Sequence, residues 1–414
     1  MKIRAIRRIL SLTLILIPVW LAAQTNLTVT PSNAAGITPE QLVQNYLIGQ
    51  GITISNVTFN GSSAAITSPQ VGSFNATSTA SASLGMSVGV ITSSGRVEEV
   101  PAPGDDFAGS ILGVAGDPDL ANIAGVNTND AAVIEFDFVP ESDKLSFRYV
   151  FASEEFYDFC TQFNDPFGFF LSGPGIEGPY SNNSVNIALM PISGFPVTIF
   201  NLCDDPSSNW CNAPEVNAFQ ECRETPGPDF VFDGLTHVFT ARYTVVPCTT
   251  YHIKLAVGDA GDSNYDSGVF LEKNSFSTNV VATTTAFTPN VGPYAVKGCS
   301  DAIVNFARPQ AEPTPVTIHF QILGTAVFGV DYSPIPDSVY IPAGMTSANL
   351  TIHPLPDGIP FEPDKTVVLR VTVINCSGSV ITETIVTIKD NNPLSATLAG
   401  SVSCLGQPQT LTPA

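Results

Sequence analysis

Apolar and polar residues alternate with a period of two along most of this 414-residue chain. Ile134, Phe136 and Phe138 alternate with acidic side chains, and the stretches 145–151 and 251–257 repeat the pattern. Such alternation is typical of strands that bury one face. Gly, Pro, Asn and Asp separate the runs, as expected of turns. The sequence therefore predicts an all-β protein built of antiparallel sheets packed as β-sandwiches.

One segment near the N-terminus predicts a helix instead. Thr38 is an N-cap residue, Pro39 suits the first helical position, and Gln41 completes a capping box. Gly49 and Gly51 are expected to end the helix. We therefore expect the first sandwich to be jelly-roll-like, with one N-terminal helix.

The chain begins with the pattern of a secretory signal peptide over residues 1–23. Four basic side chains precede an apolar run from Ile9 to Ala23, which is shorter than a membrane span needs. No later stretch reaches 18 apolar residues, so we predict no transmembrane segment. Export places the protein outside the cell or at its surface, where cysteines tend to pair.

Charge and composition divide the rest of the chain near a Ser/Thr/Ala-rich stretch at 278–285. Residues 25–278 hold 28 acidic and 7 basic side chains, a net of −21, whereas residues 279–393 hold 9 and 5, a net of −4. We predict one sandwich domain over 24–278 and a second over 279–393. Residues 394–414 would begin a further domain that this chain truncates, because about twenty residues cannot form a core.

The overall charge excludes several classes of function. With 37 Asp and Glu against 16 Lys and Arg, the net charge of −21 argues against nucleic acid and anionic membrane surfaces as partners. No P-loop, dinucleotide-binding glycine pattern or zinc-protease motif is present. We predict a protein that is not an enzyme.

The eight cysteines suggest disulfides in an exported protein. Cys299 and Cys376 are the two that fall in the second predicted domain, so we predict a bridge between them. The first domain holds five, an odd number, so one is free or pairs outside it.

Two distant loops of the first domain carry dense oxygen ligands. One loop follows the strand that ends near residue 153, and the other is the glycine-rich stretch 258–268. The candidate ligands are Glu154, Glu155, Asn164, Asp165, Asp259, Asp262 and Asp266. Ca²⁺ takes six to eight oxygen ligands from such loops, and crowded carboxylates repel one another unless a cation neutralises them.

We predict that these residues converge at one end of the domain and bind Ca²⁺. Two alternatives remain open: a solvated acidic loop, and a carboxylate pair for glycoside hydrolysis, which needs only two acids. The stretch 98–143 also holds eleven acidic and no basic residues. We interpret it as a solvated face in preference to a second cation site.

The runs FRYVFASEEF at 147–156 and FNDPFGFFLSGPG at 163–175 resemble the choice-of-anchor L domain, as do residues 186–189, 251–255 and 259–271. The resemblance covers about residues 36–278. It implies an exported, surface-displayed bacterial module, common in gliding bacteria of the Bacteroidetes type. Such proteins often end in a sorting or anchoring segment, so we expect outer-membrane association through a C-terminal segment that is missing here.

The second predicted domain resembles a Calx-β repeat through GTAVFGVDY at 324–332 and the strand 367–373. That resemblance implies an Ig-like β-sandwich whose calcium-binding members use acidic loops. The residues at or near matching positions are Asp357, Glu362, Asp364 and Asp390. The glutamate expected after the first strand is absent from the sequence VKGC at 296–299, and the closing acidic pair is reduced to Asp390 and Asn391. We therefore expect Ca²⁺ in the first domain, whereas these departures argue against it in the second.

These expectations combine into one function. We predict a secreted or cell-surface adhesion or interaction module, stabilised by Ca²⁺ and disulfides, with protein or glycan ligands on an extracellular surface. The alternative is a carbohydrate-binding or carbohydrate-cleaving jelly roll, and a third possibility is a purely structural spacer.

Overall fold

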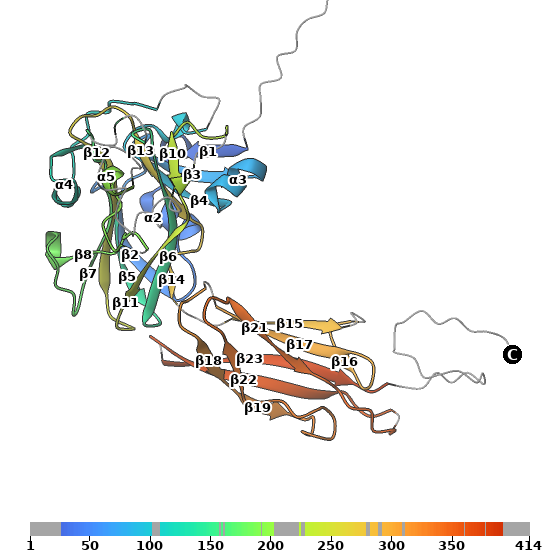
Figure 1. The fold of residues 1–414 in the computed structure, drawn as a ribbon. Coiled ribbons are helices and arrows are strands. Elements are labelled where there is room, and N and C mark those ends of the chain that lie inside the picture. The colour runs from blue at the N-terminus through green and yellow to red at the C-terminus, as the bar shows by residue number, and fades with distance from the viewer. Residues whose placement is uncertain are drawn as a thin grey trace, which may run out of the picture.

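The computed structural model of the chain describes residues 26–391 with internal gaps (Figure 1). The gaps are 102–107, 157–158, 160–161, 192, 203–222, 225–227, 279–281, 289–291, 309–310, 360 and 377. The predicted signal peptide and the predicted further domain at 394–414 lie outside the described residues. The structure is 47% strand and 12% helix, which confirms the prediction of a mostly β protein with antiparallel sheets.

Two sheets build the first unit, which comprises the described residues of 26–278. The five-stranded sheet runs in the order β2 (Ile52–Phe59), β5 (Thr128–Pro140), β12 (Tyr251–Ala260), β7 (Phe167–Ser172) and β8 (Val185–Asn186). The nine-stranded sheet runs in the order β1 (Leu27–Pro31), β3 (Val71–Ala76), β4 (Val88–Ser93), β13 (Ser267–Glu272), β6 (Lys144–Ser153), β10 (Gly234–Thr236) and β9 (Arg223–Glu224). β11 (Phe239–Thr244) and β14 (Ser277–Thr278) also pair with β6.

Aromatic side chains from both sheets meet in one core. The ring centroids of Phe147 on β6 and Phe169 on β7 are 4.1 Å apart, and those of Tyr149 and Phe167 are 5.3 Å apart. All four residues are at most 1% exposed. The period-two alternation of the sequence places these rings on one face of each strand, so the two sheets pack against each other through them.

The predicted helix is confirmed as α2 (Pro39–Tyr46). Thr38 caps it, and both hydrogen bonds of the capping box with Gln41 are present. The expectation of a single helix is wrong, however. The structure adds α1 (Ser32–Ala35), α3 (Ser78–Leu84), α4 (Pro118–Ala124), α5 (Ile199–Leu202) and two 3₁₀ turns, η1 (Val97–Glu99) and η2 (Ser181–Asn183). These helices are short, so their apolar periodicity spans too few turns to be seen in the sequence.

Three smaller sheets build the second unit, which comprises the described residues of 282–391. They are β15 (Ala282–Thr288), β17 (Asp301–Ala307) and β21 (Ser347–Ile352); β16 (Ala295–Val296), β23 (Gly378–Lys389), β22 (Lys365–Asn375) and β19 (Gln321–Gly324); and β18 (Val316–His319) with β20 (Ser338–Ile341). Their buried side chains form a separate hydrophobic cluster. Val316, Ile318, Phe320 and Ile322 alternate with polar residues, a pattern that predicts one strand over 316–322. The structure divides this run at Phe320, because its first half pairs with β20 and its second half with β22.

The predicted disulfide between Cys299 and Cys376 is wrong. Cys376 is bonded to Cys248 of the first unit, and Cys299 is itself disulfide-bonded. Cys376 lies in the turn between β22 and β23, whereas Cys299 follows Val296, which pairs with Lys389 at the far end of the twelve-residue β23. The length of that strand, roughly 35 Å, separates the two cysteines.

The Cys248–Cys376 disulfide joins the two units. Beside it, the Cys376 Sγ lies 3.4 Å from the Pro140 carbonyl oxygen at the end of β5. Arg242 on β11 donates to Glu312 at 3.2 Å and to the Ala311 carbonyl at 3.0 Å. A covalent bond and charge-assisted hydrogen bonds therefore connect the first unit to the second.

Candidate functional site: two clusters of carboxylates

The two acidic loops of the first unit meet at one end of its sheets. Ser267, the first residue of β13, pairs in register with Ser153, the last residue of β6. The Ser267 hydroxyl donates to Asp165 Oδ2 at 2.7 Å, and the Ala260 N–H donates to Asp165 Oδ1 at 2.8 Å. The strands therefore bring residues 153–165 and 258–268 together.

Five carboxylates are buried at this meeting point, and we call them the acidic cluster. They are Glu154, Glu155, Asp165, Asp259 and Asp266, and each is at most 4% exposed. No described salt bridge reaches any of them. Both side-chain oxygens of Glu155, both of Asp259 and Oδ1 of Asp266 lack any hydrogen-bond partner. A buried, unpartnered carboxylate is costly as an anion.

Burial shifts the protonation of the cluster strongly. It raises the pKa of Glu155 to about 9, with the negative charges of Asp165 and Asp262 adding to the effect. It raises the pKa of Glu154 to about 8, and those of Asp165 and Asp266 to about 7. At neutral pH the cluster therefore needs protons or a cation to neutralise it.

Asp259 is fully buried, as Glu155 is. Burial, followed by the charges of Asp165 and Asp266, raises its pKa well above the ordinary value. The nearby Ser94 hydroxyl donates to the Ser267 carbonyl at 3.3 Å, and neither oxygen of Asp259 has a hydrogen-bond partner. Asp259 thus offers two free oxygens inside the protein.

Asn164 and Asp262, the other two predicted ligands, are placed differently. The Asn164 amide accepts from the Phe200 N–H at 2.9 Å and donates to the Ala124 carbonyl at 3.3 Å, so it fixes the loop. Asp262 is half-buried and accepts from the Asn264 N–H at 3.2 Å. Asp262 acts on the cluster through its charge, which raises the pKa values of Glu155 and Asp165.

The sequence did not reveal the part that residues 99–130 play in the site. The N–H groups of Ala108 and Ser110 donate to Glu154 and Asp266, at 3.3 and 3.1 Å. The charge of Asp130 raises the pKa values of both Asp259 and Asp266. The run of eleven acidic residues at 98–143 was the signal for this contribution, but no periodicity shows which of its members are buried.

The acidic cluster has the donor chemistry of a calcium site, because every candidate ligand is a hard oxygen. Its oxygens are spaced widely, however. Among the described residues, no three members bring one oxygen each within 4.8 Å of one another. Ligands of one Ca²⁺ ion lie within about 5 Å of one another, so binding would draw these loops inward.

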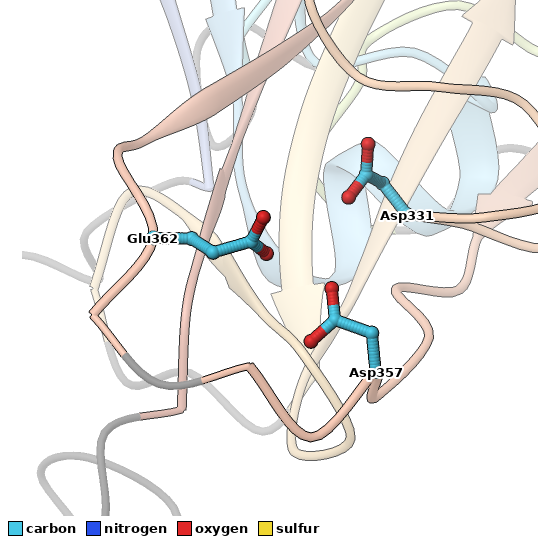
Figure 2. A group of neighbouring side chains, drawn as sticks. All are labelled: Asp331, Asp357 and Glu362. Atoms are coloured by element: carbon cyan, nitrogen blue, oxygen red, sulfur yellow. The ribbon is translucent and has the colours of Figure 1, made fainter.

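One such compact group does occur in the described part of the chain, and we call it the acidic triad: Asp331, Asp357 and Glu362 of the second unit. Figure 2 shows the three carboxylates pointing toward one another. Asp331 lies between β19 and β20, and the other two lie between β21 and β22. Two lysine ammonium groups contact the triad, those of Lys297 and Lys365.

The remaining two acids that resembled ligands in this unit lie outside the triad. Asp364 pairs with Lys389 at 2.8 Å, and Asp390 accepts from the Glu362 N–H at 3.2 Å. Asp331, which belonged to the quoted motif but was not singled out as a ligand, is the third member of the triad.

Comparison with known proteins gives one family. The model of the choice-of-anchor L domain matches residues 28–277. No curated protein matches the chain. Among solved structures, a GH2 β-galacturonidase from Eisenbergiella tayi, crystallised with galacturonate, aligns over 67% of this chain and 39% of its own, at 7% identity and a TM-score of 0.19. A TM-score this low carries no argument about fold or activity. In the described part of the chain, no helix has the length and apolar character needed to cross a membrane.

Proposed function

Because this chain belongs to the choice-of-anchor L domain family, we propose that it is an exported module displayed at the surface of a gliding-type bacterium. There it binds protein or glycan ligands and catalyses no reaction. The family match, the signal-peptide pattern and the net charge of −21 support this location and argue for partners other than nucleic acid. Attachment to the outer membrane would use a C-terminal segment beyond the described residues.

The observation that carries the chemical part of the proposal is the set of unpartnered oxygens in the acidic cluster. Ca²⁺ bound by Glu154, Glu155, Asp165, Asp259 and Asp266 would set two positive charges against these five buried carboxylates. Asn164 and Asp262 would border this site, the first by fixing its loop and the second by its charge. The ion would join loops from β6, β7, β12 and β13, and so stiffen one end of the first unit.

We also propose a sandwich type for each unit. We take the first unit as a jelly-roll-like sandwich, supported by the aromatic core shared between its two sheets. We take the second unit as an Ig-like Calx-β sandwich, supported by its separate core and the loop positions of Asp357 and Glu362. Rigid sandwiches in series suit an adhesion protein because they hold binding loops away from the cell.

Calcium titration of the full chain tests the chemical part. We expect isothermal titration calorimetry in metal-free buffer to show Ca²⁺ binding, and EDTA to lower the unfolding temperature of the first unit. The variant Asp259→Asn should bind Ca²⁺ at least tenfold more weakly. If no Ca²⁺ binding is detected and EDTA does not change the melting temperature, the acidic cluster does not bind Ca²⁺.

Ligand binding needs a separate test, because adhesion could persist without Ca²⁺. A glycan array and a protein-coated surface assay should detect the partner, and a reducing-sugar assay should remain at background. Hydrolysis that disappears in Glu154→Gln or Glu155→Gln would instead establish the carbohydrate-cleaving alternative. A chain that is silent in every assay would be a structural spacer.

A further inference from the structure

A lysine side chain stands at the centre of the acidic triad of the second unit. We propose that the Lys297 ammonium is a built-in cation that holds Asp331, Asp357 and Glu362 together in place of a divalent metal ion. This inference is independent of the function proposed above, which concerns the other unit. It predicts that the two units respond differently to calcium.

The geometry carries the proposal. One oxygen from each triad residue lies within 4.8 Å of the others, as ligands around one ion do (Figure 2). The Lys297 Nζ lies 2.6 Å from Asp357 Oδ2 and 3.0 Å from Asp331 Oδ1, and it also contacts Glu362 Oε2. The Lys297 side chain is 3% exposed. A buried ammonium at these distances occupies the space that an ion would take, since Ca²⁺–oxygen distances are about 2.3–2.6 Å.

A second lysine adds to the positive charge at the triad. The Lys365 Nζ lies 2.6 Å from Asp331 Oδ1 and 2.9 Å from Glu362 Oε1. Two ammonium groups thus face three carboxylates, which leaves a net charge of −1 in the site. In the acidic cluster of the first unit, by contrast, five carboxylates face no described cation.

The pKa values of buried carboxylates also differ between the acidic triad and the acidic cluster. Burial acts to raise the pKa of Asp331, but Lys365, the Val327 N–H and Lys297 together lower it below the ordinary value. Burial of Asp259 in the first unit raises its pKa instead. Asp331 is therefore a buried carboxylate that is already neutralised by the protein itself.

The backbone holds Lys297 at this position. Val296 pairs with Lys389 in the parallel β16–β23 ladder, and the Lys297 N–H donates to the Lys389 carbonyl at 3.0 Å. Lys297 also falls in the stretch 296–299, where the Calx-β resemblance led us to expect a glutamate. A lysine at this position supplies a positive charge in place of a fourth carboxylate ligand.

The experiment uses the full chain and asks whether removing the ammonium creates a calcium site. Lys297→Met keeps the unbranched apolar stem of the side chain and removes its charge, and Lys297→Glu supplies a fourth carboxylate. Lys389→Met is the matched control, because it removes a lysine of the same unit from its exposed pair with Asp364. Each chain is titrated with CaCl₂ by calorimetry, and hydrogen exchange of β22 and β23 reports the stability of the second unit with EDTA or CaCl₂.

We expect Lys297→Glu to bind one more Ca²⁺ per chain than the natural protein and the control. Its β22–β23 amides should be protected at least tenfold more in CaCl₂ than in EDTA, and Lys297→Met should show a smaller effect of the same sign. Exchange of β22 and β23 in the natural protein should not respond to CaCl₂. If Lys297→Glu does not fold in EDTA, recovery by refolding in CaCl₂ supports the proposal. Unchanged stoichiometry in both variants, failure of both to fold with CaCl₂ present, or calcium-dependent protection in the natural protein overturns it.

Discussion

The Ser267 hydroxyl donates a hydrogen bond to the Asp165 carboxylate, with Oγ and Oδ2 2.7 Å apart, although the two residues are 102 positions apart in the sequence. This bond ties the loop before β7 to the start of β13. Because its donor is a neutral hydroxyl, the bond aligns the loops without compensating the charge of Asp165. The first unit thus brings its acidic loops together, and this hydrogen bond leaves their negative charge uncompensated.

Asp259→Asn should stabilise the calcium-free protein and reduce the stabilisation that the protein gains from Ca²⁺. Both Asp259 oxygens are buried without partners, so replacing the carboxylate by a neutral amide removes an uncompensated charge. We expect a higher free energy of unfolding in EDTA, measured by urea denaturation at pH 8, because a neutral amide costs less to bury than a carboxylate. In saturating CaCl₂ the variant should lose its advantage.

Asp143→Asn is the control for this prediction, because the Asp143 side chain is 53% exposed and lies near Lys144. It should leave both measurements unchanged. A lower stability of Asp259→Asn in EDTA would show that the Asp259 charge is compensated in the folded protein.

The pH dependence of stability should be set by the same cluster. The folded-state pKa values of Glu155, at about 9, and Glu154, at about 8, lie above the ordinary 4.5. Between those limits the folded state binds more protons than the unfolded state, so the free energy of unfolding falls as pH rises. We expect a continuous loss of stability in EDTA from pH 5 to pH 9.

Saturating CaCl₂ should flatten this profile, because the ion stabilises the ionised carboxylates. Urea denaturation across the pH series, with and without CaCl₂, checks both parts. Stability that rises with pH in EDTA would contradict the buried, uncompensated state of Glu154 and Glu155.

The strands of the first unit could be predicted because their buried faces leave a period-two pattern. Phe147 and Tyr149 mark β6 in this way, and Phe167 and Phe169 mark β7. The capping box at Thr38 defined α2 by local hydrogen bonds alone. Where the alternation continues through a change of partner, as at Phe320, the sequence predicts one strand and the structure has two.

The candidate site could be predicted only in outline. Acidic residues at strand ends indicated which loops carry ligands, but the burial of Asp130 and the engaged amide of Asn164 depend on the tertiary packing. The contacts between the two units could not be predicted from any pattern in the sequence. Counting cysteines within one unit suggested Cys299 as the partner of Cys376, whereas Cys248 comes from the other unit. Lys297 shows the same limit, because its contacts depend on loops 34 to 65 residues further along the chain.

His252 should give the first unit a second, smaller pH dependence. His252 on β12 lies between two carboxylates of β5, with Nε2 3.4 Å from Glu135 and Nδ1 2.8 Å from Asp137. Hydrogen bonding to Glu135, and then to Asp137, raises its pKa above 6.5 despite partial burial. Its stabilising contribution is therefore fully present below pH 6.5 and is lost as pH rises through the folded-state pKa.

An NMR titration of the His252 ring should give a pKa above 6.5, and His252→Gln should lower stability at pH 5.5 more than at pH 8.5. The His252 side chain is 33% exposed, so solvent screening keeps the effect modest. His319→Gln, at an exposed position on β18, is the control. Equal losses at the two pH values would mean that packing, and not charge, accounts for the role of His252.

The disulfide between Cys248 and Cys376 should fix the two units relative to each other. It closes a separation of 128 residues, and the Arg242–Glu312 ion pair is a second link between the units. Because each unit has its own core, Cys376→Ser should leave both folded and act on the junction. We expect faster proteolysis of the segment 278–285 and a larger radius of gyration by small-angle X-ray scattering. Peptide mapping without reductant should recover Cys248 and Cys376 in one cross-linked species. Cys299→Ser should leave that species intact, and a cross-linked peptide joining Cys299 to Cys376 would instead restore the bridge within the second unit.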